Sequence, residues 1–159
     1  MNPPAALHVL VVCTANQCRS PLVAALLRER LRQRGADAAA VEVASAGFLE
    51  GGRPMPSTGV RVARGAGLEL SDHRSTRLTR EMTARADLIL TATREHAREL
   101  VADDDALWCR TFVLQSAERQ LREMERRSGQ SRSSWIEAAG AARDRRTLLG
   151  GPGPEDLED

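Results

Sequence analysis

The residues best suited to chemistry lie in one short stretch near the start of the chain. Cys13 is followed six positions later by Arg19, and Ser20 and Pro21 come directly after it. A cysteine thiolate can attack phosphorus, and the planar guanidinium of arginine can bind two oxygens of a phosphoryl group at once. The spacing therefore predicts an enzyme that takes a phosphoryl group onto sulfur.

A cysteine with an arginine six residues later is weak evidence by itself, because 23 of the 159 residues are basic. The alternative interpretation is a buried strand cysteine beside a solvated arginine. The context favours the chemistry: an apolar run at 9–12 precedes Cys13, Ser20 is a typical N-cap, and Pro21 suits a first helical turn. The intervening loop would present its backbone N–H groups to an anion, and it consists of Thr14, Ala15, Asn16, Gln17 and Cys18.

Two further groups are needed for turnover. The Ser20 hydroxyl could donate a hydrogen bond to the sulfur of Cys13 and hold it as thiolate; the alternative role of Ser20 is helix capping, and the two are compatible. Expelling an alkoxide or phenoxide also calls for a general acid, usually a carboxylate. The sequence supplies no unambiguous one.

Size and composition indicate one domain spanning residues 1–159 and exclude several classes of protein. The formal net charge is +1, which gives no drive toward nucleic acid or an anionic membrane, and no apolar run has the length of a membrane span. Three cysteines fit a reducing compartment, so we expect a cytoplasmic protein. No cofactor and no metal site is predicted.

The hydrophobic pattern alternates between strands and helices. Strands are predicted at 7–12, 41–46, 87–91 and 110–114, and helices at 20–35, 58–66 and 93–101. This order predicts an α/β three-layer sandwich, in which a four-stranded parallel sheet carries helices on both faces and the anion loop follows the first strand. Residues 116–147 are expected to be helical, with a solvated Arg/Glu face rather than a nucleic-acid patch, and 148–159 form a Gly/Pro/acidic tail.

Four ordered motifs carry a resemblance to a known family. The stretch 13–21 resembles the active-site loop of low-molecular-weight protein-tyrosine phosphatases, a family that includes related arsenate reductases and phosphoarginine phosphatases. The segments 43–47, 67–75 and 87–90 are similar to its second strand, its Gly-Ile-Asp-x-x-x-His segment and its third strand. The resemblance covers residues 7–115.

This resemblance implies roles for the loop residues. Cys13 would be the nucleophile that forms a thiophosphate, Arg19 the phosphate clamp and Ser20 the support of the thiolate. Asn16 would hold the loop in a strained conformation, and asparagine tolerates positive φ well. Its tethers would be Ser20, Ser45 and His73.

The remaining cysteines and histidines receive weaker interpretations. The resemblance implies that Cys18 could form a reversible disulfide with Cys13, and the alternative is that Cys18 is a small buried residue. Cys109 is expected in the core. His8 and His96 match no motif and are interpreted as structural.

The general acid is where the sequence departs from the family. The family places it in an Asp-Pro dipeptide, which does not occur here. We therefore expect the chain to be truncated before the usual acid loop and last helix, or Asp156 or Asp159 to substitute, or the acid to be absent. Gln17 stands at a position that differs between tyrosine and phosphoarginine phosphatases and matches neither.

The expected function is hydrolysis of phosphomonoesters, foremost protein phosphotyrosine. The alternative is a phosphate-binding protein of the same fold whose turnover is impaired. Phosphoarginine hydrolysis and arsenate reduction are lesser alternatives. The expected partners are a phosphorylated protein and a phosphate or other oxyanion.

Overall fold

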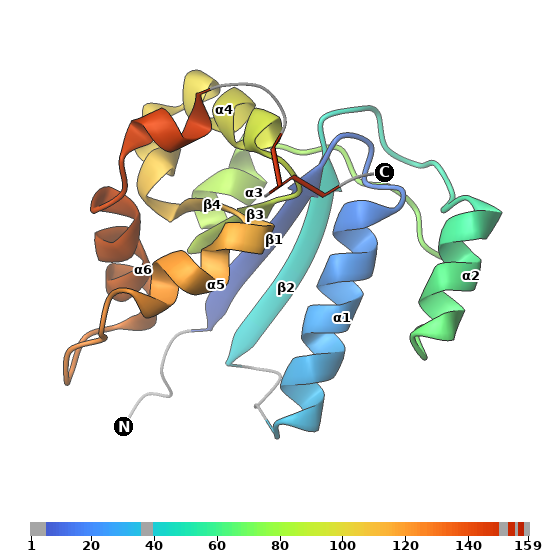
Figure 1. Cartoon of the computed structure of the whole chain (residues 1–159). Helices are drawn as coiled ribbons and strands as arrows, with labels where there is room; N and C mark the ends of the chain where they lie inside the picture. Colours follow the sequence, from blue (N-terminus) through green and yellow to red (C-terminus); the bar gives the residue numbers. More distant parts are fainter. Residues whose placement is uncertain (1–5, 36–39, 150–152, 155, 158–159) are drawn as a thin grey trace.

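A computed structural model describes residues 6–35, 40–149, 153–154 and 156–157. Its centre is a parallel sheet of four strands in the order β2-β1-β3-β4 (Figure 1). The strands are β1 (Leu7–Cys13), β2 (Val41–Gly47), β3 (Leu88–Thr91) and β4 (Thr111–Val113). β1 pairs with β2 along its whole length and with β3 from Val9 to Val12, so Cys13 ends an inner strand. The predicted four-stranded parallel sheet is confirmed.

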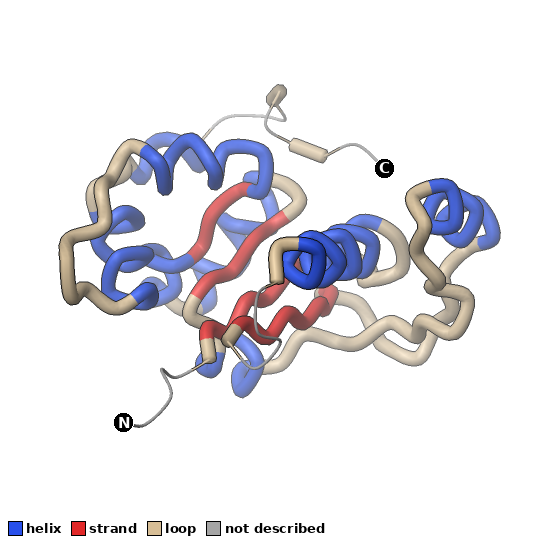
Figure 2. The backbone as a smooth tube through the Cα atoms, turned by 90° about the horizontal axis from the view of Figure 1, so that it is seen from below, coloured by secondary structure: helices blue, strands red, loops and turns tan. Residues whose placement is uncertain are grey.

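Helices cover both faces of this sheet, which is why the inner strands are continuously apolar rather than alternating. One face packs against α1 (Arg19–Gln33), α5 (Leu114–Arg122) and α6 (Arg132–Ala141), and the other against α3 (Arg80–Arg85) and α4 (Arg94–Asp103). Figure 2 shows the sheet between the two layers. The three-layer sandwich expected from the sequence is confirmed.

Successive residues of β1 are divided between two cores. Val9 packs with Phe112 of β4 and Ile136 of α6, whereas Leu10 packs with Ile89 and with Leu100 of α4. This period of two follows from the pleat of the strand. The packing holds the carboxyl end of β1 firmly between two layers.

The structure contains short elements that the sequence pattern did not indicate. They are α3 and the 3-10 helix Asp105–Arg110, whereas a second 3-10 helix, Arg145–Leu148, overlaps the end of the region 116–147 that was expected to be helical. Each is six residues or shorter, too short for a helical period to be recognised. The helix predicted at 58–66 is α2 (Ser57–Gly65), which lies at the edge of the molecule beside α1 (Figure 1). Within 116–147, the two helices are separated by a turn region.

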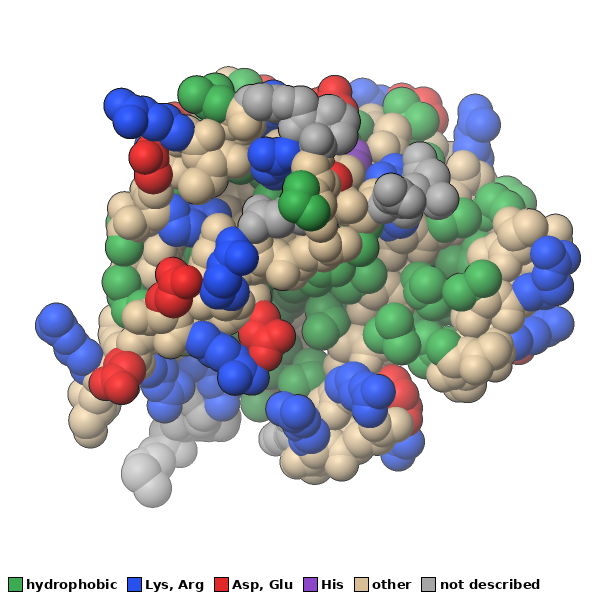
Figure 3. Space-filling model, in the orientation of Figure 1, with side chains coloured by type: hydrophobic (Ala, Val, Ile, Leu, Met, Phe, Trp, Pro, Cys, Tyr) green, Lys and Arg blue, Asp and Glu red, His purple; other side chains and the backbone are tan. Residues whose placement is uncertain are grey.

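One face of the molecule carries hydrophobic side chains between α5 and α1 (Figure 3). Partly buried residues of these helices, Leu27 of α1 and Leu114 and Leu121 of α5, pack on the edge of the same core. Within the described ranges, no helix combines the length and the apolar character that crossing a membrane requires.

Candidate active site

The residues singled out by the sequence lie at the carboxyl edge of the sheet. β1 ends at Cys13 and α1 begins at Arg19, so residues 13–19 form the connecting loop, here called the 13–19 loop. Ligands of open α/β sheets bind at this edge. Cys13 is 2% exposed, at the base of the loop, and its Sγ lies 3.0 Å from Oγ of Ser20.

Ser20 does not cap the helix, contrary to one of its two predicted roles. α1 starts one residue earlier than expected, with Cys18 at the N-cap position and no side-chain cap. Instead the buried Ser20 hydroxyl accepts a hydrogen bond from Nδ2 of Asn16 at 2.9 Å. Because that bond uses a lone pair, the hydroxyl keeps its hydrogen, which has two acceptors within reach: the Ala46 carbonyl at 3.4 Å and the Cys13 sulfur at 3.0 Å. A thiolate at Cys13 can only accept that hydrogen.

Asn16 holds the loop in an unusual conformation. It is the one non-glycine residue in the described part of the chain with positive φ, at 52°. Its Nδ2 also donates to Oγ of Ser45 at 2.9 Å, and its Oδ1 accepts from the backbone N–H of Thr76 at 2.7 Å. Nε2 of His73 lies 2.7 Å from the Asn16 carbonyl, and since a carbonyl only accepts, this nitrogen carries the proton. The expected contacts of Asn16 with Ser20, Ser45 and His73 are all present.

Gly47, at the end of β2, allows this loop to lie against the neighbouring strand. A Cβ built there would lie 2.6 Å from the backbone nitrogen of Asn16 and 2.7 Å from the carbonyl oxygen of Thr14. No side chain fits in that space, so only glycine permits the close approach. The sequence motif included Gly47, but its reason is visible only in the packing.

Three successive main-chain donors of the 13–19 loop are available to a bound anion. Among the described residues, none accepts a hydrogen bond from the backbone N–H groups of Ala15, Asn16 or Gln17. Successive amides in such a turn favour an anion. The side chain of Gln17 instead donates to the carbonyl of Pro54 at 3.0 Å.

Arg19 is held by bonds from both of its terminal nitrogens. Nη2 donates to Oγ1 of Thr14 at 3.2 Å, and Nη1 donates to the carbonyl of Leu157 at 3.2 Å. A guanidinium has five N–H donors, so these bonds are compatible with a bidentate grip on an oxyanion. Cysteine, serine, arginine and loop amides therefore converge at one edge of the sheet.

A family model described as low molecular weight phosphotyrosine protein phosphatase matches residues 8–122. The chain belongs to this family. Residues from three of its motifs contact one another in the fold: Asn16 with Ser20, Ser45 and His73.

Individual relatives agree with this membership. A probable low molecular weight protein-tyrosine-phosphatase, EpsP of Ralstonia solanacearum, is 40% identical over 95 residues, 59% of this chain and 61% of that protein. The chain spans between about half and three-fifths of the length of the curated relatives matched.

Solved structures share the fold. The low molecular weight protein tyrosine phosphatase of T. tengcongensis is 28% identical, with a TM-score of 0.64, over 86% of this chain and 92% of that one. The YwlE arginine phosphatase of Geobacillus stearothermophilus is 27% identical, with a TM-score of 0.60, over 85% and 84% of the chains.

His96 reaches the site of this family member, although the sequence interpretation left it structural. Its Nε2 lies 2.9 Å from Oγ1 of Thr14 in the 13–19 loop. The two residues are 82 positions apart. The sequence signal that existed was its place three residues after Thr93, the predicted helix cap, which positions the ring at the first turn of α4.

Asp156, in the region 148–159, packs against the start of α4. Oδ1 of Asp156 accepts from the backbone N–H of Arg94 at 2.6 Å, and Oδ2 accepts from Gly153 at 2.8 Å. Burial alone would raise the pKa of Asp156, but these two N–H groups and the Arg94 guanidinium outweigh it and lower the pKa. A carboxyl held ionised in this way is a poor proton donor at neutral pH. The other proposed acid, Asp159, lies outside the described residues.

The remaining cysteines lie in different surroundings. None of the three cysteines, all of which lie in the described ranges, forms a disulfide. Cys18 lies against α2, where its Sγ would be 3.3 Å from a Cβ added at Gly59. Cys109 is half-buried in the 3-10 helix before β4 and packs at the margin of a small core.

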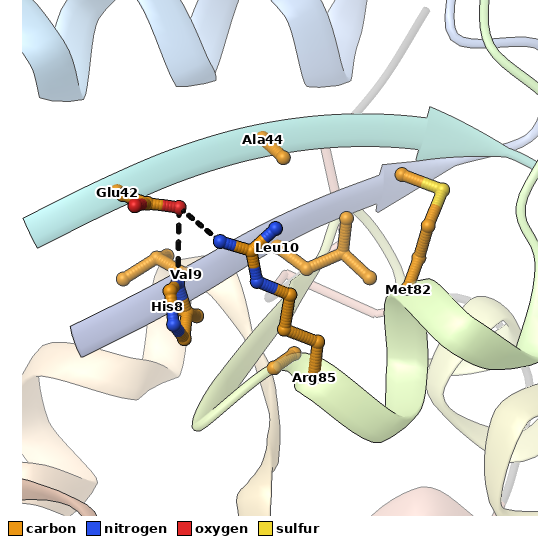
Figure 4. A pocket seen from close by; sticks show the side chains of 8 residues that line it. His8, Val9, Leu10, Glu42, Ala44, Met82 and Arg85 are labelled. Atoms are coloured by element: carbon orange, nitrogen blue, oxygen red, sulfur yellow. Dashed lines mark hydrogen bonds and ion pairs between the residues drawn. The ribbon is translucent and has the colours of Figure 1, made fainter. Parts of the chain in front are cut away.

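A second group of polar residues lies far from the 13–19 loop. A pocket of about 160 Å³ opens at the amino end of β1 and β2, where Glu42 contacts His8 and Arg85 (Figure 4). His8 is five residues before Cys13, about 16 Å along an extended strand. In the described ranges, no three His, Cys, Asp or Glu side chains gather as metal ligands do.

Proposed function

We propose that this protein is a cysteine-dependent phosphatase that hydrolyses phosphomonoesters through a thiophosphate on Cys13. The observation that carries the proposal is the 3.0 Å contact between the Cys13 sulfur and the Ser20 hydroxyl, at the base of a loop whose Ala15, Asn16 and Gln17 amides have no acceptor among the described residues. A structural cysteine would need neither the hydroxyl nor the anion-binding loop beside it.

In the first step the Cys13 thiolate attacks phosphorus in line with the leaving oxygen. An S–P bond forms, the P–O ester bond breaks, and the leaving alkoxide or phenoxide takes up a proton from water. The loop amides and Arg19 bind the equatorial oxygens, whose charge they stabilise as the phosphoryl group becomes planar. Positioning and electrostatics supply most of the acceleration in such a transfer.

In the second step water attacks the phosphocysteine. The P–O bond to water forms, the S–P bond breaks, and Cys13 leaves as thiolate while phosphate is released. The Ser20 hydroxyl, 3.0 Å from the sulfur, stabilises this leaving group by donating its hydrogen to it. Ser20 therefore matters more for the second step than for the first.

The proposed substrate is protein phosphotyrosine. Curated relatives at about 40% identity are named protein-tyrosine phosphatases, which supports this substrate class. Phosphoarginine is the second candidate, since a structural neighbour at 27% identity is an arginine phosphatase. Initial rates on a phosphotyrosine peptide and on a phosphoarginine protein, compared at equal enzyme concentration, decide between them.

The proposed setting is the cytoplasm, with a phosphorylated protein as partner and no cofactor. Arsenate reduction in this family needs two cysteines besides the nucleophile on a mobile segment after the third strand. In this chain the other two are Cys18, inside the 13–19 loop, and Cys109. Their places make arsenate reduction the poorer fit.

The test uses p-nitrophenyl phosphate, whose leaving group needs little protonation. Wild-type protein is expected to release phosphate, and Cys13→Ser and Arg19→Ala to abolish release. Rapid acid quenching with labelled substrate is expected to trap label on Cys13. Full activity in Cys13→Ser would end the proposal.

The alternative is a phosphate-binding protein of the same fold that does not turn over. It predicts that inorganic phosphate binds to the wild type while a single-turnover assay releases none from substrate. The two proposals therefore differ in the amount of phosphate released in the single-turnover assay.

A further inference from the structure

Both ring nitrogens of His96 make hydrogen bonds to threonine hydroxyls. The residue is 7% exposed, in the first turn of α4. Nδ1 lies 2.7 Å from Oγ1 of Thr93, and Nε2 lies 2.9 Å from Oγ1 of Thr14. The ring thus bridges the end of β3 and the 13–19 loop.

The plane of this ring is fixed by its neighbours. Phe48, from the loop after β2, stacks on it with ring centroids 5.8 Å apart and planes 12° from parallel. Thr93 is itself held as the N-cap of α4, where its hydroxyl accepts from the backbone N–H of His96. Because stacking and capping act together, the ring has little freedom to turn away from the loop.

The Thr14 hydroxyl that contacts His96 also contacts Arg19. A guanidinium only donates, so Oγ1 of Thr14 must accept from Nη2 of Arg19. Thr14 is exposed, and its side chain could otherwise rotate away from the arginine. The bond to His96 holds the hydroxyl in the orientation that receives Arg19, whichever ring nitrogen carries the proton.

We propose that His96 is a positioning residue that orients Arg19 for the phosphate through Thr14. The inference rests on the proposed function, because it assigns Arg19 to a bound oxyanion. Losing one bond to a charged donor is expected to weaken phosphate binding about 10-fold. An arginine with more rotational freedom also stabilises the transition state less well, so kcat falls together with the affinity.

Two substitutions separate positioning from packing. His96→Gln places an amide near the position of Nε2 and keeps a partner for Thr14. His96→Asn places its amide near the position of Nδ1, and so keeps Thr93 but not Thr14. We expect kcat/KM for p-nitrophenyl phosphate and the affinity for inorganic phosphate to fall about 10-fold in His96→Asn, and to stay within about 3-fold of wild type in His96→Gln. His8→Asn, at the far end of β1, is the matched control and is expected to match the wild type.

A double variant tests whether His96 acts through Thr14. In a Thr14→Val background, His96→Asn is expected to cause no further loss, because the link is already broken. Additive losses, or a phosphate affinity in His96→Asn equal to wild type, would overturn the proposal. Equal losses in His96→Asn and His96→Gln would do the same, because they would indicate packing alone.

A measurement on the unaltered histidine covers the case in which a His96 variant does not fold. The chain has only three histidines, so ring ¹⁵N signals of histidine-labelled protein are few. Titration with inorganic phosphate is expected to shift the His96 signals in the wild type, much less in Thr14→Val, and to leave those of His8 in place. Unmoved His96 signals would overturn the proposal.

Phosphate affinity keeps this test separate from the proposed function. If the wild type binds phosphate but hydrolyses no ester, the phosphatase proposal fails, and the ranking of the His96 variants by phosphate affinity still decides the inference. If the wild type is active and His96→Asn equals it in both measurements, only the inference fails.

Discussion

The guanidinium of Arg19 touches a residue 138 positions later in the chain. Its Nη1 donates to the carbonyl of Leu157, whose own N–H donates to the carbonyl of Ala92. The described residues Asp156 and Leu157 therefore form a short segment that lies over the start of α4 and against the proposed phosphate clamp. Anything that releases this segment changes the surroundings of Arg19.

Asp156 is expected to anchor the segment in a pH-dependent way. Its pKa is lowered in the folded protein, so its contribution is complete above the carboxyl's unfolded pKa of roughly 3.9 and is lost as the pH falls through the lower folded value. Hydrogen exchange at the Leu157 amide is the measurement. Protection is expected at pH 6, with a loss in Asp156→Ala but not in Asp103→Ala, which removes an exposed carboxylate. Full protection in Asp156→Ala would contradict the anchoring role.

Gly47→Ala is expected to displace the 13–19 loop. The new Cβ would lie 2.6 Å from backbone, which cannot move aside as a side chain can. We expect a loss of about 1–3 kcal/mol in the free energy of unfolding and a marked loss of phosphate affinity, measured by denaturation and calorimetry. Gly65→Ala is the control, because nothing lies within 4 Å of its Cβ and its φ is not positive. A Gly47→Ala protein that binds phosphate normally would refute the steric argument.

Ser20→Ala is expected to slow release of phosphate from Cys13 more than formation of the phosphocysteine. The variant removes the hydroxyl 3.0 Å from the sulfur, so the thiolate becomes a poorer leaving group. We predict a kcat about 10-fold lower and a pre-steady-state burst of p-nitrophenolate. Ser116→Ala removes another buried hydroxyl, bonded to Val113, and should leave kcat unchanged. A Ser20→Ala enzyme without a burst and with normal kcat contradicts this role.

Asn16 contributes side-chain hydrogen bonds and also adopts a left-handed backbone conformation. Two substitutions separate the effect of the hydrogen bonds from that of the backbone conformation. Asn16→Gly and Asn16→Ala both lose the side-chain bonds to Ser20, Ser45 and Thr76, so both should bind phosphate more weakly. Alanine is also disfavoured at positive φ, whereas glycine is not, so the free energy of unfolding of Asn16→Ala should be about 1 kcal/mol lower than that of Asn16→Gly. Urea denaturation measures the difference. Equal stabilities would show that the backbone conformation relaxes when the side-chain bonds are gone.

The sequence was sufficient for features that depend on local signals. The apolar run ending at Cys13, the helix that follows it and the strand–helix alternation predicted the parallel sheet and the place of the loop. These features follow from side-chain periodicity and turn chemistry within a few residues. The boundary at Ser20 was wrong by one position, because Ser20 is used by the sulfur rather than by the helix end.

Tertiary structure decided which distant residues reach the loop. His96 and Leu157 contact Thr14 and Arg19 across 82 and 138 residues, and no local pattern indicates either contact. The need for glycine at position 47 could not be predicted from the sequence either. The 13–19 loop lies against Gly47 only when β2 is paired with β1. The physical reason is that propensity acts along the chain, whereas hydrogen bonds and steric exclusion act through space once the sheet has set the distances.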